Sequence, residues 1–463
     1  MSRSVRLVPA VAALLVLVLT GTACDAGVRG VPGGSGVGDP YFPKAGNGGY
    51  DVGHYGLALD YTPATRRLTG TADITARATR DLSAFDLDLA GLRVDSVRVE
   101  GERARWNRTG QELTVRPHTG LGKGETFRVT VRYSGTPRTL TDPDGSKEGW
   151  LPTADGALAL GEPVGSMTWF PGNHHPSDKA SYDIAVTVPE GLKAVSGGEQ
   201  TDQTTKDGRT TYRWRSAQPM ASYLATVAIG RFDITRTTGP HGLPIVTAVD
   251  PGQARASAGV LAKIPEILGW AETHFGPYPF SSAGAIVARP GDAGYALETQ
   301  TRPVFPGPPD VSTLVHELAH QWYGDSVGPA SWRDMWLNEG FATYAEWLYD
   351  EDNGGPTAQQ TFTGLYEDGP DALWAFPPAR PSSAAHISGA PVYQRGAMVV
   401  HKIRRTVGDG TFHDIVQGWA AAHRHGTADT AGFVRYVERK APGKDFRTVW
   451  KDWLYGDGKP AHA

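Results

Sequence analysis

Two histidines and two glutamates carry the clearest chemistry in this sequence. His316 and His320 stand four residues apart in the run HELAH. On a helix, residues at this spacing project from one face about one turn apart, which suits imidazole ligation of a single zinc ion. Glu317 can reach a water on the metal without being a ligand, and Glu339, in the later run WLNEGFA, is the natural third ligand. The pattern predicts a catalytic zinc site; the alternative is a core helix whose imidazoles bond backbone groups.

The elements that would hold these residues are predicted to be mainly helical. The zinc helix is expected to begin after Pro308 and Pro309, with Asp310 or Ser312 as its N-cap. A second helix, carrying Glu339, is expected at about 335–349. Apolar spacing predicts further helices at about 253–275, 392–406, 411–423, 430–439 and 449–454, and a short buried strand at 283–288. The second half of the chain is therefore predicted to be helical with a small sheet at its start.

The first half has a different pattern. Apolar and polar residues alternate with the period of β-strands, and Gly, Asp and Pro turns separate the runs. The clearest runs are 54–61, 92–99, 127–133, 182–189 and 223–230. The sequence thus predicts a multidomain fold, β then α+β: an antiparallel β-saddle or sandwich domain at 50–238, followed by a mainly helical domain at 239–463.

Length and charge limit the classes of function. A chain of 463 residues is long enough for two or three domains with sizeable cores. Its formal net charge is −4, which leaves no basic footprint, so we expect no nucleic-acid partner. Oligomeric state is not legible from the sequence.

The N-terminus resembles a bacterial lipoprotein signal. Arg3 and Arg6 precede an apolar run at 7–19 that is too short for an ordinary membrane-spanning helix. Small residues then lead to Cys24, the only cysteine of the chain. We expect a signal peptide at 1–23, lipidation of Cys24 and a location on the outer side of the cell membrane. Simple cleavage with secretion, or an uncleaved anchor, are the alternatives. Residues 24–49 are rich in Gly and Pro and are predicted to form a flexible linker.

A family resemblance covers most of the chain, from about 50 to 393. The runs HELAHQWYGDSV and WLNEGFATYAE resemble the aminopeptidase N family of zinc metallopeptidases, in the gluzincin clan. So do DVGHY at 51–55, the FP…PSDKA run at 170–180 and HFGPYPF at 274–280. In that family a saddle-shaped β-domain packs on a thermolysin-like catalytic domain. Many members continue into a large helical C-terminal domain; this chain resembles a short form without it, which would leave a more open cleft.

The resemblance implies a role for each residue of the zinc site. His316, His320 and Glu339 would hold one zinc ion, which lowers the pKa of a water to about 7. Glu317 would act as general base. Tyr393, in the run VYQRGA, matches the family's catalytic tyrosine and would donate to the oxyanion. Without the resemblance, Tyr393 could equally be a packed core residue.

The same resemblance implies a reader of the substrate's free amine. The family's G-x-M-E-N loop corresponds to 295–299, preceded by Gly294. Glu298 is kept, whereas Tyr295, Leu297 and Thr299 replace the Gly, Met and Asn of the pattern. These departures concern the shape of the subsite rather than its carboxylate. In the family this loop lies at a sheet edge, to which a peptide can add as a strand. Glu162 falls where the family places a second amine-binding residue. The alternative is that Glu162 is a loop residue with no role in binding.

Two further carboxylates are candidates to orient a ligand histidine. Glu346 lies seven residues after Glu339 on the same helical face, and Asp334 lies just before that helix. Either can instead be a charge on the helix surface.

The sequence therefore predicts a zinc-dependent aminopeptidase acting on peptides with a free N-terminus. A thermolysin-type endopeptidase is an alternative, disfavoured by Glu298. A non-catalytic, zinc-binding surface or interaction protein is another, disfavoured because such a protein needs neither Glu317 nor Tyr393.

Overall fold

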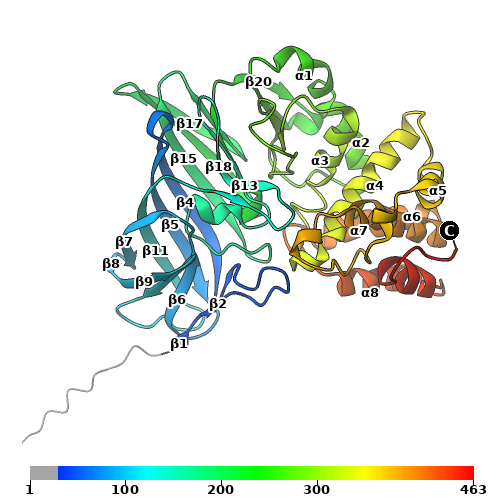
Figure 1. Ribbon diagram of the computed structural model, residues 1–463, viewed down its shortest axis with the longest axis horizontal. Helices are drawn as coiled ribbons and strands as arrows, with labels where there is room; N and C mark the ends of the chain where they lie inside the picture. The colour runs from blue at the N-terminus through cyan, green and yellow to red at the C-terminus, as the bar shows by residue number, and fades with distance from the viewer. Residues whose placement is uncertain (1–29, 463) are drawn as a thin grey trace, which may run out of the picture.

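The computed structural model describes residues 30–462. A β-rich half and a helical half lie side by side, with the helices gathered on one side of the molecule (Figure 1). The predicted order, β then mainly helical, is confirmed. The predicted signal peptide and Cys24 lie outside the described residues. Within residues 30–462, none of the helices combines the length and the apolar composition that crossing a membrane requires.

An eight-stranded sheet is the largest element of the β-rich half. Most of its long strands alternate buried with more exposed residues, as β4 (Tyr50–Thr62) does, because one face packs on the core. The prediction of an antiparallel sheet needs one correction: β15 and β4 pair in parallel, with Ser181 opposite His54. The strands, in spatial order, are β17 (Glu199–Lys206), β18 (Arg209–Ala221), β15 (Lys179–Pro189), β4 (Tyr50–Thr62), β5 (Arg67–Ala78), β11 (Thr126–Gly135), β7 (Arg93–Val99) and β8 (Glu102–Arg103).

Two smaller sheets, of four and five strands, also belong to this half. One contains, in order, β1 (Val31–Pro32), β6 (Leu82–Asp88), β10 (Glu112–Arg116) and β9 (Arg105–Thr109). The other contains β12 (Thr139–Thr141), β13 (Lys147–Pro152), β14 (Ala157–Leu160), β19 (Val227–Gly230) and β16 (Lys193–Ser196). The strand predicted at 223–230 is shorter than expected, because Ser222–Leu224 forms a 3₁₀ turn before β19.

The predicted flexible linker is wrong for residues 30–49. This segment forms β1 and the pair β2 (Gly34–Ser35) and β3 (Asn47–Gly48). Its Asp39 is 4% exposed and joins three parts of the chain. The carboxylate accepts from the backbone N–H of Tyr41 at 2.8 Å, from His175 Nε2 in the β-rich half at 3.3 Å, and from the N–H of Trp332 in the helical half at 3.0 Å. Gly and Pro content alone did not reveal this long-range anchor.

The helical half begins earlier than predicted. β20 (Asp233–Thr238) pairs with β21 (Pro244–Val249), and these continue into β22 (Ala283–Val287) and β23 (Val304–Phe305). A boundary at 238 would cut through the β20–β21 hairpin. We therefore use "β-domain" for residues 50–231 and "helical domain" for residues 232–462.

The helices follow the predicted positions with local differences. The helix predicted at 253–275 is broken into α1 and α2 at Ala262 and Lys263, and α5 was not predicted. A π-helical turn at Pro391–Arg395 precedes α6, and another at Val449–Leu454 lies near the C-terminus. The helices are α1 (Ala254–Leu261), α2 (Ile264–Phe275), α3 (Val311–Ala319), α4 (Trp336–Asp352), α5 (Ala358–Asp368), α6 (Gly396–Val407), α7 (Asp409–Ala422) and α8 (Thr430–Lys440).

Candidate active site

Three side chains from two helices converge on one point. His316 lies on α3, His320 caps its C-terminal end, and Glu339 lies in the first turn of α4. His316 Nε2 lies 3.2 Å from Glu339 Oε2, His320 Nε2 lies 3.3 Å from the same oxygen, and the two nitrogens are 3.1 Å apart. Asp310 starts α3 as predicted, because its Oδ1 accepts from the N–H of Thr313 at 2.8 Å.

These three atoms fit a tetrahedral zinc ion. Ligand atoms about 2.0–2.2 Å from a tetrahedral centre stand about 3.3–3.6 Å apart, close to the spacing found here. Burial acts to raise the pKa of Glu339, but the two imidazoles outweigh it and lower that pKa to about 2. Two nitrogen donors and one anionic oxygen therefore face a common point, and a fourth position can face the cleft.

The outer nitrogens of both histidines are held by other groups. His316 Nδ1 donates to Glu346 Oε1 at 2.7 Å, and His320 Nδ1 donates to the carbonyl oxygen of Tyr323 at 2.9 Å. Ser312 Oγ donates to Glu346 Oε2 at 2.5 Å and so fixes that carboxylate. With Nδ1 occupied on each ring, Nε2 is left to bind a metal. Two other triads are close enough to hold an ion, Glu298–Glu317–His320 and Glu162–Glu298–Glu339, but neither has both imidazoles oriented toward it.

Glu317 is suited to accept a proton. It is 6% exposed, and its Oε2 is buried without a hydrogen-bond partner among the described residues. Burial raises its pKa to about 7, although His316 and His320 act in the opposite direction. A general base works best when its pKa is close to the operating pH, so a carboxylate with a pKa near neutral pH meets this requirement.

Tyr393 lies beside the metal ligands. Its ring stacks on that of His316, with the centroids 6.0 Å apart and the planes 11° from parallel. It lines the same cleft as the triad and Glu317. Burial, followed by the charge of Glu339, raises the pKa of its phenol well above the usual value, so the hydroxyl keeps its proton and can donate. The sequence could not place this residue without the family resemblance.

Glu298 and Glu162 complete the carboxylate group. Carboxylate oxygens of Glu162, Glu298 and Glu339 lie within 4.8 Å of one another. Glu298 is 3% exposed, with Oε1 buried and unpartnered among the described residues. Burial, followed by the charges of neighbouring carboxylates, raises the pKa of Glu162, and burial raises that of Glu298, although His320 acts in the opposite direction on both. The arrangement calls for a small cation.

The loop that carries Glu298 lies at a sheet edge, as expected. Leu297 forms an antiparallel bridge with Val304 of β23, the last strand of the four-stranded sheet. Tyr295, one of the departures from the family pattern, points its hydroxyl toward the carbonyl of Glu162 at 3.4 Å. Tyr295 therefore forms part of the wall between the two glutamates.

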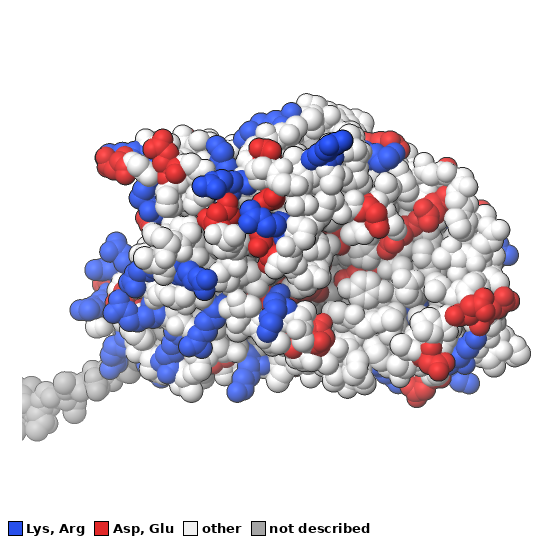
Figure 2. Space-filling model, turned by 45° about the horizontal axis from the view of Figure 1, so that its top comes forward, with Lys and Arg blue, Asp and Glu red and all other residues white. Residues whose placement is uncertain are grey.

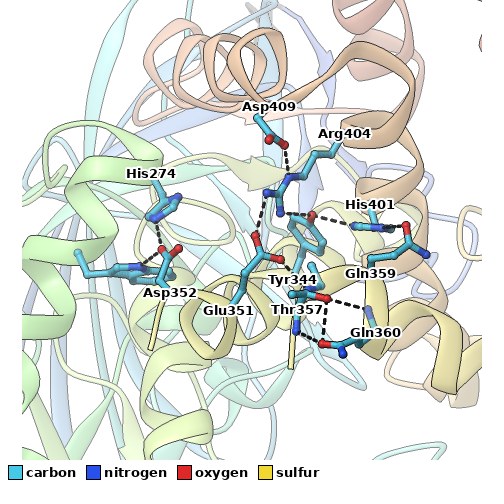
Figure 3. A network of polar contacts seen from close by, with 12 residues as sticks. His274, Tyr344, Glu351, Asp352, Thr357, Gln359, Gln360, His401, Arg404 and Asp409 are labelled. Carbon is cyan, nitrogen blue, oxygen red and sulfur yellow. Dashed lines mark hydrogen bonds and ion pairs between the residues drawn. The ribbon is translucent and has the colours of Figure 1, made fainter. Parts of the chain in front are cut away.

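The last turn of α4, which follows Glu346, is tied to the neighbouring helices α6 and α2 (Figure 3). These contacts help to fix the helix that carries Glu339 and Glu346. Glu351 accepts from Arg404 Nη2 of α6 at 2.9 Å, and Arg404 also pairs with Asp409 of α7 at 2.7 Å. Asp352 accepts from His274 Nε2 of α2 at 2.9 Å. These contacts leave the N-terminal half of α4 directed at α3.

The site opens into a cleft of about 880 Å³ between the two domains. Figure 2 shows a hollow with acidic side chains in and around it, while most Lys and Arg side chains on this face lie over the β-domain. The charged residues that line the cleft, besides the metal ligand and base, are the acidic Asp142, Asp144, Glu162, Asp292 and Glu298 and the basic Lys147. The excess of carboxylates favours a positively charged ligand.

Asp334 does not belong to the metal site, so its predicted role is wrong. It is buried, and its Oδ1 accepts from the N–H of Thr430 at 2.9 Å and from the Thr430 hydroxyl at 2.7 Å. Asp334 thus fastens the start of α8 to the segment before α4. By contrast, the predicted contact of Glu346 with a ligand histidine is confirmed.

Phe42, Asp142 and Gln321 are among the residues of the site that sequence reasoning missed. Phe42, from the segment predicted to be a linker, lines the cleft, and so does Asp142 from the β12–β13 loop. Gln321 follows His320 directly and links the zinc helix to the backbone at Glu298 and Thr301. Only Gln321 carried a signal, because a polar residue next to a metal ligand at a helix end is a candidate for a supporting contact.

Comparison with protein families agrees with this geometry. The family model described as the peptidase family M1 domain matches residues 309–453, and that described as the peptidase M1 N-terminal domain matches residues 52–224. The first match contains the metal triad, and the second lies within the β-domain.

Solved structures and curated proteins give the same result. A mutant of the M1 zinc metallopeptidase of Deinococcus radiodurans, bound to a Tyr-Ser-Ala substrate, is 30% identical, with a TM-score of 0.84 over 92% of this chain and 99% of that one. A two-domain M1 zinc metallopeptidase mutant bound to L-arginine is 31% identical, with a TM-score of 0.84 over 92% and 98%. Probable aminopeptidase 2 of Sulfurisphaera tokodaii is 24% identical over 81% of this chain and 50% of its own length. Glutamyl aminopeptidase of Bos taurus is 25% identical over 63% and 34%. The chain thus spans about half the length, or less, of these curated relatives.

Proposed function

Because the chain belongs to the M1 family of zinc metallopeptidases, we propose that it is an aminopeptidase that removes the first residue of peptides through a zinc-assisted hydrolysis. The observation that carries this proposal is the position of Glu298 and Glu162 against the triad, with carboxylate oxygens of Glu162, Glu298 and Glu339 within 4.8 Å of one another. A free α-ammonium bound by these two carboxylates brings the first peptide bond to the metal ligands.

Each residue of the site has a separate role in the proposed reaction. His316, His320 and Glu339 hold the zinc ion, which when bound acts as a Lewis acid and lowers the pKa of a water to about 7. Glu298 and Glu162 bind the ammonium and exclude substrates with a blocked N-terminus. Glu317 accepts a proton from the attacking water and passes it to the departing amine. Tyr393 donates a hydrogen bond to the oxygen on which negative charge develops.

The acidic cleft supports an amine-reading site over an endopeptidase. An endopeptidase needs room for chain on both sides of the scissile bond, whereas two carboxylates crowd one side of the triad here. In an endopeptidase complex, these two carboxylates would lie against an uncharged peptide backbone. They would then lose their hydration without gaining a cation as partner, which costs free energy. A non-catalytic zinc protein would have no use for Glu317 and Tyr393 at their positions beside the triad.

Product analysis tests the proposal. An unmodified decapeptide is incubated with the zinc-loaded protein, and its products are followed by mass spectrometry. We expect successive loss of single residues from the N-terminus, arrest by a zinc chelator, and recovery when zinc is added back. Internal cleavage would indicate the endopeptidase, and an intact peptide would indicate the non-catalytic zinc protein.

We propose that the protein acts outside the cytoplasm, as a lipoprotein on the outer side of the cell membrane. The signal-like residues before Cys24 support this location. Replacing Cys24 by Ser should release the protein from the membrane fraction in a bacterial host that processes lipoproteins. Membrane retention of the Cys24→Ser variant would contradict lipidation at this residue.

A further inference from the structure

Two cationic side chains cross the junction between the domains in opposite directions. Lys179, the first residue of β15, extends from the β-domain into the helical domain, and Arg302, just before β23, extends from the helical domain into the β-domain. Among the described residues, neither forms an ion pair with a carboxylate; both donate to backbone carbonyl oxygens. Lys179 reaches the turn that follows His320, and Arg302 extends from the hairpin that carries Glu298.

Lys179 is matched to three carbonyl groups. Its Nζ donates to the carbonyl oxygens of Asp325 at 2.7 Å, Ser326 at 2.9 Å and Gly426 at 3.0 Å. An ammonium has three N–H donors, so these contacts use its full capacity. Gly426 also accepts from the N–H of Gly328 at 3.0 Å, which joins the two segments that Lys179 holds.

The Lys179 contacts lie on the turn that orients a metal ligand. The turn 323–326 follows the zinc helix, and its Tyr323 carbonyl accepts from His320 Nδ1 at 2.9 Å. The N–H of Asp325 donates back to the carbonyl of His320 at 2.9 Å. A Cβ on Gly324, whose φ is +134°, would stand 3.0 Å from His320 Nδ1, so this turn packs directly on the ligand ring. Moving the turn therefore moves the hydrogen-bond acceptor of His320.

Arg302 makes the reciprocal contacts. Its guanidinium is fully buried and donates to the carbonyl oxygens of Ser196 and, at 3.1 Å, of Gly198 in the β-domain. Its Nε donates to the carbonyl of Val246 at 3.2 Å. The guanidinium carbon lies 4.8 Å from the ring centre of Trp214 in β18. These four contacts fix the side chain in one orientation.

Arg302 lies on the returning arm of the hairpin that carries Glu298. Leu297 and Val304 close this hairpin by donating to each other's carbonyl at 2.9 and 2.8 Å, and the Arg302 N–H donates to Thr299 at 2.9 Å. At its tip, Thr301 Oγ1 accepts from the N–H of Gly198 at 2.7 Å. The position of the Glu298 carboxylate is thus set by contacts of its hairpin with the β-domain.

Gln321 connects the two sets of contacts. Its Oε1 accepts from the N–H of Thr301 at 2.7 Å, and its Nε2 donates to the carbonyl of Glu298 at 3.3 Å. It is fully buried and directly follows His320. The metal-ligand turn and the Glu298 hairpin are therefore linked to each other as well as to the β-domain.

We propose that Lys179 and Arg302 are positioning residues through which the β-domain sets the geometry of the site. Lys179 holds the turn that orients His320, and Arg302 holds the hairpin that presents Glu298; the second role rests on the proposed aminopeptidase function. A junction needed only for stability could be apolar, because desolvating a cation costs more than burying an alkyl chain. Lys179 binds carbonyls of the turn beside His320, the metal half of the site, and Arg302 anchors the hairpin of Glu298, the Glu298 half, to carbonyls of the β-domain. These contacts give each cation a role in positioning.

The metal half is tested by zinc affinity without any measurement of turnover. Lys179→Met, Lys179→Arg and the control Lys193→Met on β16 are titrated against a chromophoric chelator, and thermal unfolding is recorded without metal. We expect the zinc dissociation constant of Lys179→Met to rise about 10–100-fold. Lys179→Arg, which retains a charged donor, should recover most of the affinity, and Lys193→Met should match wild type. A folded Lys179→Met that binds zinc as tightly as wild type would overturn the proposed role of Lys179. If Lys179→Met does not fold, the comparison is made with Lys179→Arg. A Lys193→Met variant that binds zinc as weakly as Lys179→Arg would then overturn the role.

The Glu298 half is tested by discrimination between free and blocked amines. The ratio of kcat/KM for a peptide to that for its N-acetylated form is compared in Arg302→Met, in the milder Arg302→Lys and in Arg236→Met. Arg236 is an exposed residue that contacts Gln200 across the same junction at 2.6 Å, away from the site. We expect the ratio to fall about tenfold or more in both Arg302 variants, because lysine cannot reproduce the planar fork, and to remain unchanged in Arg236→Met.

The outcomes separate this inference from the proposed function. If wild type itself cleaves free and acetylated peptides equally, the aminopeptidase assignment fails, while the zinc titration still tests Lys179. If wild type discriminates and a folded Arg302→Lys keeps the wild-type ratio, the positioning role of Arg302 is overturned and the aminopeptidase assignment stands.

Discussion

Glu346 Oε1 lies 2.7 Å from Nδ1 of His316, and its other oxygen accepts from the Ser312 hydroxyl. The two residues are thirty positions apart in the sequence and lie on different helices, α4 and α3. This contact turns the Nε2 atom of His316 toward Glu339, so the zinc site depends on a residue that touches no metal. The stability of metal binding should therefore depend on Glu346.

Glu346→Gln should weaken zinc binding about 10–100-fold, because an amide is a poorer acceptor for the imidazole N–H than a carboxylate. The dissociation constant, measured by competition with a chelator, checks this. Asp350→Asn, an exposed change on the same helix, is the matched control and should bind zinc as wild type does. Equal affinities of the Glu346 and Asp350 variants would show that the contact does not tune the metal.

Glu317→Gln should keep zinc and lose turnover. The amide retains the shape of the side chain but cannot accept a proton, and a general base contributes about 10²–10⁴-fold to rate. Zinc content is measured on the purified variant, and kcat on an aminoacyl anilide. A variant with full zinc occupancy and more than a tenth of wild-type kcat would exclude Glu317 as the base.

Tyr393→Phe should lower kcat about 100-fold or more and leave KM and zinc affinity nearly unchanged, because its hydroxyl acts on the charge that develops during the reaction. Steady-state kinetics on the same anilide separate the two constants. Tyr366→Phe removes a tyrosine hydroxyl that donates to Pro460, outside the cleft, and should have no effect on kcat. A change in KM alone would reassign Tyr393 to substrate binding.

Asp39→Asn should destabilise the protein in a pH-dependent manner. Burial acts to raise the pKa of Asp39, but hydrogen bonds from His175, from the N–H groups of Phe42 and Tyr41 and from Ser331 outweigh it and hold that pKa well below its usual range. Since the folded pKa is depressed, the stabilisation is fully present above about pH 4 and is lost as the pH falls further.

At neutral pH we expect Asp39→Asn to lower the free energy of unfolding by about 2–3 kcal/mol, the scale of hydrogen bonds to a charged group. Denaturant unfolding of metal-free protein at pH 7 and at lower pH measures the difference. The gap between the variant and wild type should narrow as the pH falls below 4. A gap that stays constant with pH would show that the Asp39 carboxylate is not the anchor.

The sequence was sufficient for the parts of the site that depend on local spacing. His316, Glu317 and His320 lie on one helix, and the i, i+4 pattern predicts their common face. Alternation predicted most long strands, since each buries one face. Glu346 was predicted in the same way, from its helical offset to Glu339.

The residues that escaped prediction act over long sequence separations. Asp39 contacts Trp332, and Lys179 contacts Gly426, and no periodic pattern links the members of either pair. Asp334 was predicted because, like Glu346, it lies close in the sequence to Glu339. Its carboxylate instead accepts from Thr430. Such contacts depend on how the domains pack, which local propensity does not determine.

We propose that Glu298 selects substrates by their free amine, and one comparison tests this selection most directly. The ratio of kcat/KM for a peptide to that for its N-acetylated form is measured for wild type and for Glu298→Gln, both loaded with zinc. We predict that wild type cleaves the free peptide at least about 100-fold better, because the acetylated peptide leaves the buried Glu298 carboxylate without an ammonium partner. Glu298→Gln should lose most of this preference. Equal cleavage of both peptides by wild type, or an undiminished preference in Glu298→Gln, would contradict the account.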